Sequence, residues 1–152
     1  MILPTRLTRS ATLPRYAHPG DSGLDGAMRA WRWSYEDDDQ ARAGWLVLHP
    51  GGIAKAFLGV AVELPDGFEV QVRPRSGNSL RGLWCAWGTG DASYRGELSA
   101  SLANVSGSPL VVNVGDRVCQ LVVAPVVRVE FVEVGELGVT ERGSNGFGSS
   151  GR

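Results

Sequence analysis

Alternating apolar and polar residues are the dominant pattern along this chain. Residues 31–35 and 127–131 alternate strictly, which is the period of a β-strand with one buried face. Turn-forming residues at 65–67, 106–109 and 114–116 divide the rest of the chain into short segments. The remaining predicted strands are residues 45–48, 54–64, 69–73, 99–104 and 116–124. Many short strands at this spacing predict an all-β sandwich or barrel.

Glycine and proline limit the alternatives to a β-fold. The chain has 21 glycines and 8 prolines in 152 residues, and its longest stretch without either covers residues 27–43. This leaves no room for a helical bundle, and the length suits one domain. No apolar window reaches the roughly 18 residues of a membrane span, and residues 1–16 do not resemble a secretory leader. We therefore expect a cytoplasmic protein that does not enter the membrane.

An acidic run separates two of the predicted strands. Residues 36–39 are Glu-Asp-Asp-Asp and lie between the strands expected at 31–35 and 45–48. This order predicts a β-hairpin with an acidic tip. A solvated tip is the favoured interpretation over a metal site, and a structural role is favoured for the whole segment 31–45.

Charge and cysteine content exclude several functions. The 15 basic and 16 acidic residues give a net charge of −1, whereas proteins that bind nucleic acids usually carry a basic excess. Two cysteines and two histidines are too few for a Cys/His zinc site or a disulfide framework. A catalytic metal would have to be held by oxygen ligands, and free nucleotides remain possible substrates.

Five segments carry residues that neither a core nor a linker requires, although a turn, a strand start or a disordered tail would explain each one alone. Together they combine carboxylates, guanidinium groups, hydroxyls and glycine-rich backbone, as binding of a polyphosphate requires. In chain order they are residues 18–26 with Asp21 and Asp25, residues 73–77 with Arg75, Ser76 and Gly77, residues 88–97 with Asp91 and Tyr94, residues 115–121 with Gln120, and the tail 142–152 with Arg142, Phe147, Gly148, Ser149 and Ser150.

The five segments and their order resemble the trimeric dUTP pyrophosphatase (dUTPase) family. The resemblance implies a distorted jelly-roll β-barrel in residues 1–137, followed by a C-terminal arm, residues 138–152, that is mobile without a ligand. It also implies a homotrimer with three active sites shared between subunits. The reaction would be hydrolysis of dUTP to dUMP and pyrophosphate, which keeps uracil out of DNA and supplies dUMP for thymidylate synthesis.

The resemblance assigns roles to single residues. Asp91 would orient and deprotonate the water that attacks the α-phosphorus, and Tyr94 would lie against the deoxyribose and exclude a 2′-hydroxyl. The backbone of residues 83–87 would read uracil. The other substrate-binding residues would be Arg75 at the interface, Ser76 and Gln120 on phosphate oxygens, Phe147 stacked on uracil, Arg142, Ser149 and Ser150 on the γ-phosphate, and Gly77 and Gly148 in the same segments. Mg²⁺ would be carried mainly by the triphosphate and water, with Asp25 acting through a water molecule.

Three features depart from the family pattern. Cys85, which we include among the base-binding positions, stands six residues before Asp91, where the family usually has asparagine. Gly90 replaces an aliphatic residue, and residues 31–45 look like an insertion, for which binding of a regulatory protein is a minority hypothesis. Two other functions stay open from the sequence alone. One is a dCTP deaminase-related enzyme, and the other is a regulatory protein that uses this fold to bind nucleotide or a partner.

Overall fold

The computed structural model of the chain describes residues 1–36 and 41–146, and the regular secondary structure in these residues is almost all β-strand. None of the helical structure in the described residues is long and apolar enough to cross a membrane. The elements are β1 (Thr5–Leu7), β2 (Leu24–Ala27), β3 (Ala30–Trp33), β4 (Trp45–Leu48), β5 (Ile53–Phe57), β6 (Val60–Val62), β7 (Phe68–Arg73), α1 (Ser76–Leu80), β8 (Leu83–Cys85), β9 (Gly88–Gly90), β10 (Ser99–Asn104), β11 (Leu110–Asn113) and β12 (Arg117–Pro125).

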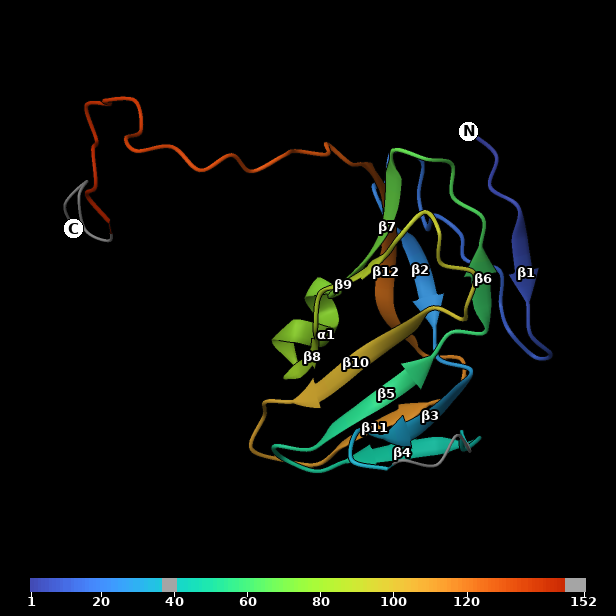
Figure 1. Cartoon of the computed structure of the whole chain (residues 1–152). Coiled ribbons are helices and arrows are strands. Elements are labelled where there is room, and N and C mark those ends of the chain that lie inside the picture. The colour runs from blue at the N-terminus through green and yellow to red at the C-terminus, as the bar shows by residue number, and fades with distance from the viewer. Residues whose placement is uncertain (37–40, 147–152) are drawn as a thin grey trace.

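The strands form antiparallel sheets that connect distant parts of the chain. The two larger sheets have the strand orders β3-β5-β10-β8 and β2-β12-β7-β9, and the pairs β1-β6 and β11-β4 complete the fold (Figure 1). Strand β2 near the N-terminus pairs with β12, the last strand described. Such long-range antiparallel crossovers confirm the predicted all-β, jelly-roll-like architecture.

The core draws on both larger sheets and on the β11-β4 pair, and it follows from the alternation in the sequence. In β10, Ala100 and Leu102 are buried, and in β7 the buried residues are Val70 and Val72. All four belong to one apolar cluster. Residues between them, such as Gln71, point to the other face of the sheet and are only partly buried. This is the period of two that the sequence predicts.

Pairing in residues 30–48 differs from the predicted hairpin. Strand β3 pairs with β5, and β4 pairs with β11, so the hairpin prediction is wrong. Alternation shows which face of a strand is buried, but it does not identify the partner strand. Trp31 instead exchanges two backbone hydrogen bonds with Arg42, at 2.9 and 2.7 Å. Glu36 of the predicted acidic tip forms an ion pair with Arg42, and residues 37–39 lie outside the described residues.

Two further strand predictions need correction. The strand expected at 54–64 is divided into β5 and β6, because Gly59 has a positive φ of +71°. Residues 127–131 form no strand, and Val127 and Phe131 are 84% and 96% exposed. Beyond Arg128 the chain runs away from the body as an extended arm, with no strand of the described chain beside it (Figure 1). An alternating segment becomes a strand only when a partner supplies hydrogen bonds.

Candidate active site

Three polar residues form one row across the sheet β2-β12-β7. Gln120 lies opposite Asp25 on one side and opposite Arg73 on the other. The Gln120 side chain donates from Nε2 to the carbonyl oxygen of Pro74 at 2.9 Å. A Cβ atom at Gly23 would lie 2.6 Å from Gln120 Oε1, so any larger residue there would have to displace the amide. The row therefore brings the first, second and fourth motifs together.

The carboxylate of Asp25 joins two guanidinium groups. Its oxygens lie 3.2 Å from Arg75 Nη2 and 3.0 Å from Arg117 Nη1, and its side chain is only 18% exposed. Arg75 also donates from Nη1 to the carbonyl oxygen of Arg117 at 3.3 Å. Both carboxylate oxygens are thus engaged in ion pairs, which leaves Asp25 poorly placed to ligate a metal directly. Its contact with magnesium through water stays a prediction.

Ser76 and Gly77 begin a short helix that the sequence analysis did not predict. Both residues are exposed in the first turn of α1, directly after the segment that leaves β7. Asn78, which we did not single out, holds this helix in place by donating from Nδ2 to the carbonyl oxygens of Arg117 and Val118 at 3.0 and 3.3 Å. Ser76 directly follows Arg75, whose guanidinium contacts Asp25 of the row, and a contact between Ser76 and phosphate stays a prediction.

Asp91 and Tyr94 lie together on one turn after β9. The backbone N–H of Tyr94 donates to the carbonyl oxygen of Asp91 at 3.0 Å, and the Tyr94 hydroxyl donates to the carbonyl oxygen of Glu97 at 3.1 Å. A Cβ atom at Gly96 would collide with the tyrosine ring. Gly90 is similarly required, because a Cβ there would lie 2.7 Å from Val70 Cγ1, and this explains why an aliphatic residue is absent. Asp91 and Tyr94 are both exposed.

The two groups of residues lie at opposite ends of β7. Gly90 pairs with Val70, whereas Gln120 pairs with Arg73. Three residues of a strand span roughly 10 Å, and Asp91 lies one residue further from Gln120 than Gly90 does. One chain therefore does not bring Asp91 and Tyr94 into contact with Ser76 and Gln120. This separation is what a site assembled from more than one subunit would require.

Cys85 lies in the core and not on the surface. Its residue is 1% exposed, and its Sγ is 3.4 Å from the carbonyl oxygen of Ala86. Burial raises the pKa of the Cys85 thiol to about 11, and burial raises the pKa of Cys119 as well. The neighbouring exposed side chain Trp87 stacks with the guanidinium of Arg73 at 4.9 Å. A contact between Cys85 and a bound base stays a prediction.

We expect both thiols to be unreactive in the folded protein. Because the thiolate is the nucleophile, a buried thiol with a raised pKa reacts slowly with a disulfide reagent at pH 8. Titration with Ellman's reagent should detect Cys85 and Cys119 only after unfolding in guanidinium chloride, which serves as the control for complete reaction. Rapid reaction of the folded protein at either position would contradict the burial described above.

The C-terminal arm carries the fifth motif. Arg142 donates from Nε to the carbonyl oxygen of Asn145 at 3.0 Å and is exposed. The segment 127–146 extends away from the body of the same chain (Figure 1). The predicted binding residues Phe147, Gly148, Ser149 and Ser150 lie outside the described residues, and their roles stay predictions. The predicted domain boundary after Leu137 falls within this extended arm.

Comparison with known proteins assigns the chain to a family. The dUTPase family model matches residues 44–151. The chain belongs to the dUTPase family. This confirms the resemblance, and it accounts for the order of the motifs described above. The described residues contain no group of three or more His, Cys, Asp or Glu side chains placed to hold a metal ion.

Curated relatives and solved dUTPase structures agree with this assignment. Deoxyuridine 5'-triphosphate nucleotidohydrolase of Anaplasma marginale is 45% identical over 91% of this chain and 88% of its own length. The Thermobifida fusca protein of the same name is 44% identical over 96% of this chain and 76% of its own length. A mutant dUTPase of Staphylococcus bacteriophage 80alpha with dUpNHpp superposes with a TM-score of 0.82, 26% identity and 99% coverage of both chains. A mutant dUTPase from phage phi11, described with a structural Mg(II) ion, has a TM-score of 0.73, 25% identity, and covers 90% of this chain and 98% of its own.

Proposed function

We propose that this protein hydrolyses dUTP to dUMP and pyrophosphate by attack of water on the α-phosphorus. The observation that carries the proposal is the match of the dUTPase family model over residues 44–151. Two features of the fold support it: the turn that joins Asp91 to Tyr94, and the row that joins Asp25, Gln120 and Arg73. The product dUMP would feed thymidylate synthesis, and removal of dUTP would keep uracil out of DNA.

Asp91 and Tyr94 would form the reacting half of the site. An exposed carboxylate can accept a proton from water at hydrogen-bond distance, which is the role proposed for Asp91. Tyr94 is 47% exposed, so its side chain is accessible to a ligand while its hydroxyl donates to the carbonyl oxygen of Glu97. A deoxyribose would fit against the ring of Tyr94, whereas the 2′-hydroxyl of a ribose would not. The backbone of residues 83–87, with Cys85 behind it, would read the base.

Ser76 and Gln120 would bind phosphate oxygens in the other half of the site, together with the backbone at Gly77. Arg75, already in an ion pair with Asp25, would hold the subunit interface beside them. Because these residues lie at the opposite end of β7 from Asp91, a homotrimer with shared sites is the assembly that we propose. The arm would complete the site with Arg142, Phe147, Gly148, Ser149 and Ser150.

Magnesium would enter with the triphosphate. Both oxygens of Asp25 are engaged by arginines, so the residues suit a cation whose ligands are mainly phosphate oxygens and water. When bound, Mg²⁺ would neutralise part of the phosphate charge and fix the conformation of the triphosphate. Asp25 would orient one of the bound waters.

Hydrolysis in ¹⁸O-labelled water tests the proposal. Attack on the α-phosphorus places the label in dUMP, whereas attack on the β-phosphorus places it in pyrophosphate. Label in pyrophosphate would contradict the proposed reaction. Incubation with dCTP, followed by an ammonia assay, tests the deaminase alternative, and no ammonia should form. Nucleotide binding without any hydrolysis would favour the alternative of a regulatory protein.

Replacing Tyr94 with alanine should weaken the selection against ribose. Removal of the ring opens space beside C2′, so UTP should become a better substrate, at some cost in dUTP turnover. The measurement is the ratio of kcat/KM for dUTP to that for UTP, with the wild-type protein as the reference. An unchanged ratio would show that Tyr94 does not exclude the 2′-hydroxyl.

A further inference from the structure

Glu97 ends the turn that carries Asp91 and Tyr94, and its carboxylate is held from two sides. Arg29 Nη2 lies 3.2 Å from both carboxylate oxygens, and Arg29 Nε lies 3.4 Å from Oε1. The backbone N–H of Gly59 donates to the same Oε1 at 2.6 Å. The side chains of Arg29 and Glu97 are 25% and 24% exposed, so the pair is partly shielded from water. A charged pair of this kind keeps its geometry better than an exposed one.

The groups that hold Glu97 are themselves fixed. The backbone N–H of Arg29 donates to the carbonyl oxygen of Phe57 at 2.7 Å, and the N–H of Thr8 donates to that of Gly59 at 2.8 Å. Gly59 has a φ of +71°, and a Cβ atom there would lie 2.7 Å from Thr8 Oγ1, so no other residue suits the position. The carboxylate of Glu97 is therefore anchored to a rigid part of the fold.

Glu97 is in direct contact with Tyr94, the residue proposed to exclude a 2′-hydroxyl and called the sugar gate below. The Glu97 carbonyl oxygen accepts the hydrogen bond of the Tyr94 hydroxyl, and the absence of a side chain at Gly96 leaves room for the ring. The N–H of Tyr94 in turn binds the carbonyl oxygen of Asp91. Movement of Glu97 would therefore displace the ring of Tyr94 and alter the turn that ends at Asp91.

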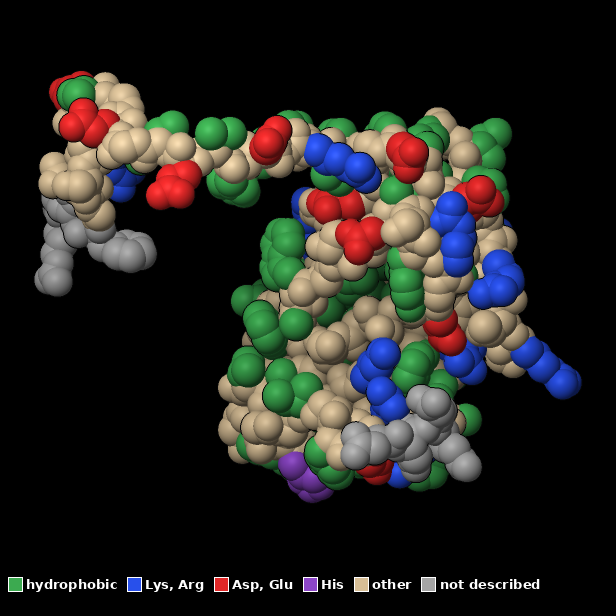
Figure 2. All heavy atoms as spheres, viewed as in Figure 1, with side chains coloured by type: hydrophobic (Ala, Val, Ile, Leu, Met, Phe, Trp, Pro, Cys, Tyr) green, Lys and Arg blue, Asp and Glu red, His purple; other side chains and the backbone are tan. Residues whose placement is uncertain are grey.

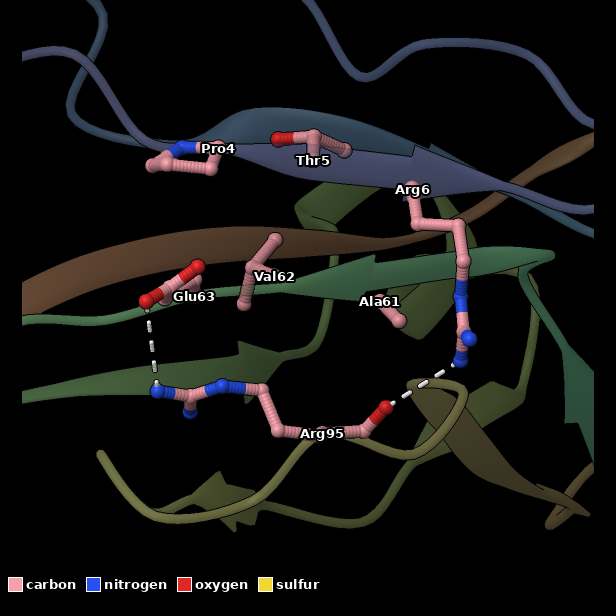
Figure 3. A pocket seen from close by; sticks show the side chains of 7 residues that line it. All are labelled: Pro4, Thr5, Arg6, Ala61, Val62, Glu63 and Arg95. Carbon is pink, nitrogen blue, oxygen red and sulfur yellow. Dashed lines mark hydrogen bonds and ion pairs between the residues drawn. The ribbon is translucent and has the colours of Figure 1, made fainter.

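Arg95, the arginine of the turn, contacts the turn itself and other elements, since its Nη1 donates to the carbonyl oxygens of Ala92 and Tyr94 at 2.5 and 3.1 Å. Arg95 lines a hollow beside the β1-β6 pair, where its Nη2 is 3.8 Å from Glu63 Oε1 and its carbonyl oxygen accepts from Arg6 Nη2 at 3.3 Å (Figure 3). Its side chain is about half exposed, so this ion pair contributes little to the position of the turn. Arg95 therefore supports the backbone of the turn, whereas the Arg29–Glu97 pair holds the residue that accepts the hydrogen bond of the Tyr94 hydroxyl.

We propose that Arg29 is a positioning residue for sugar selection. By holding Glu97, Arg29 fixes the ring of Tyr94 in the position that admits a deoxyribose and excludes a ribose. Arg29 itself does not touch the substrate in this proposal. The inference rests on the proposed function of Tyr94, and it adds a residue that belongs to none of the five motifs.

A purely structural ion pair would behave differently from a positioning one. If Arg29 only stabilised the fold, its loss would lower the melting temperature and leave substrate selection unchanged. If Arg29 positions Tyr94, its loss lets the ring move and changes the relative rates of dUTP and UTP. The ratio of the two kcat/KM values therefore separates the two roles, because a loss of folded protein cancels in it.

The test compares Arg29→Met, Arg29→Lys and the control Arg9→Met, which alters an exposed arginine next to Thr8. We expect Arg29→Met to lower the ratio of kcat/KM for dUTP to UTP on the order of tenfold, since small misplacements of a positioning group are costly. Arg29→Lys, which keeps one charged donor, should recover part of the ratio, and Arg9→Met should keep all of it. An unchanged ratio in Arg29→Met, with or without a lower melting temperature, would overturn the proposal.

Two further variants keep the test decisive. If Arg29→Met does not fold, Glu97→Gln is measured instead. Its amide loses the negative charge but retains an oxygen that can accept from the N–H of Gly59. An unchanged ratio of kcat/KM for dUTP to UTP in Glu97→Gln would also overturn the proposal. Tyr94→Ala is measured in parallel. If Tyr94→Ala lowers the ratio and Arg29→Met does not, only the positioning role fails. If Tyr94→Ala leaves the ratio unchanged, the sugar gate fails, and the positioning role fails with it.

Discussion

Replacing Asp91 with asparagine should lower kcat for dUTP by about a hundredfold or more, because an amide cannot accept the proton of the attacking water. The substitution preserves the size of the side chain, and Asp91 is exposed, so folding and nucleotide binding should be retained. Pyrophosphate release in single-turnover and steady-state experiments measures the loss. Binding of a non-hydrolysable dUTP analogue measures the affinity.

Asp66→Asn is a matched control for this substitution. Asp66 lines the same hollow as Asp91, beside Glu69 and Arg128, and removal of its charge changes the local potential by a similar amount. It should leave turnover within a few-fold of the wild-type value, as expected for an electrostatic effect at an exposed position. Near-normal turnover of Asp91→Asn, or an equal loss in both variants, would remove the catalytic role from Asp91.

The second large effect is recovery of activity when two inactive proteins are mixed. One carries Asp91→Asn, and the other is truncated after Leu137 and lacks the fifth motif. If the arm closes over a site whose Asp91 belongs to another subunit, the truncated chain supplies Asp91 and the mutant chain supplies the arm. Random mixing at equal concentrations should rebuild about a quarter of the sites, from one half times one half, in a cyclic assembly.

A site built within one chain predicts the opposite outcome. Each subunit would then lack one essential part, and no mixed trimer could recover activity. Unfolding and refolding the mixture ensures exchange of subunits, and native mass spectrometry shows whether mixed trimers form. Each parent refolded alone sets the baseline. Mixed trimers without pyrophosphate release above that baseline would contradict the shared site.

The extended arm is the reason to expect that one subunit contributes its C-terminal segment to another. Residues 127–131 have the alternation of a strand, and yet Val127 and Phe131 are exposed in the structure of one chain. Figure 2 shows hydrophobic and charged side chains interspersed along the arm, which lies away from the body over most of its length. A segment with this pattern is stable as a strand only beside a partner. We predict that another subunit supplies that partner.

Local patterns in the sequence predicted the strands better than their pairing. Strand β4 coincides with the predicted residues 45–48, and β10 coincides with 99–104. The hairpin at 31–48 was wrong, because the partners of β3 and β4 are set by packing between distant segments. The helix α1 was missed because it has only five residues and no side-chain cap, so it has almost no local signal.

The motifs predict residues for the site, but they do not predict how far apart those residues lie in space. Pairing of β2, β12 and β7 brings Asp25 and Gln120 together, as expected from the grouping of the motifs. The distance between Gln120 and Asp91 depends on strand register, which no motif encodes. Arg29 was missed for a related reason, since its partner Glu97 is 68 residues away and no pattern links the two.

Pyrophosphate release from dUTP, UTP, dTTP and dCTP, measured separately on the wild-type protein with Mg²⁺, is the most direct test of dUTP hydrolysis. Efficient release is expected from dUTP, with kcat/KM values for the other three nucleotides lower by orders of magnitude. The dUTP signal should be lost in Asp91→Asn. Comparable rates on all four nucleotides, or no release from dUTP, would contradict the assignment of this protein as a dUTP-hydrolysing enzyme.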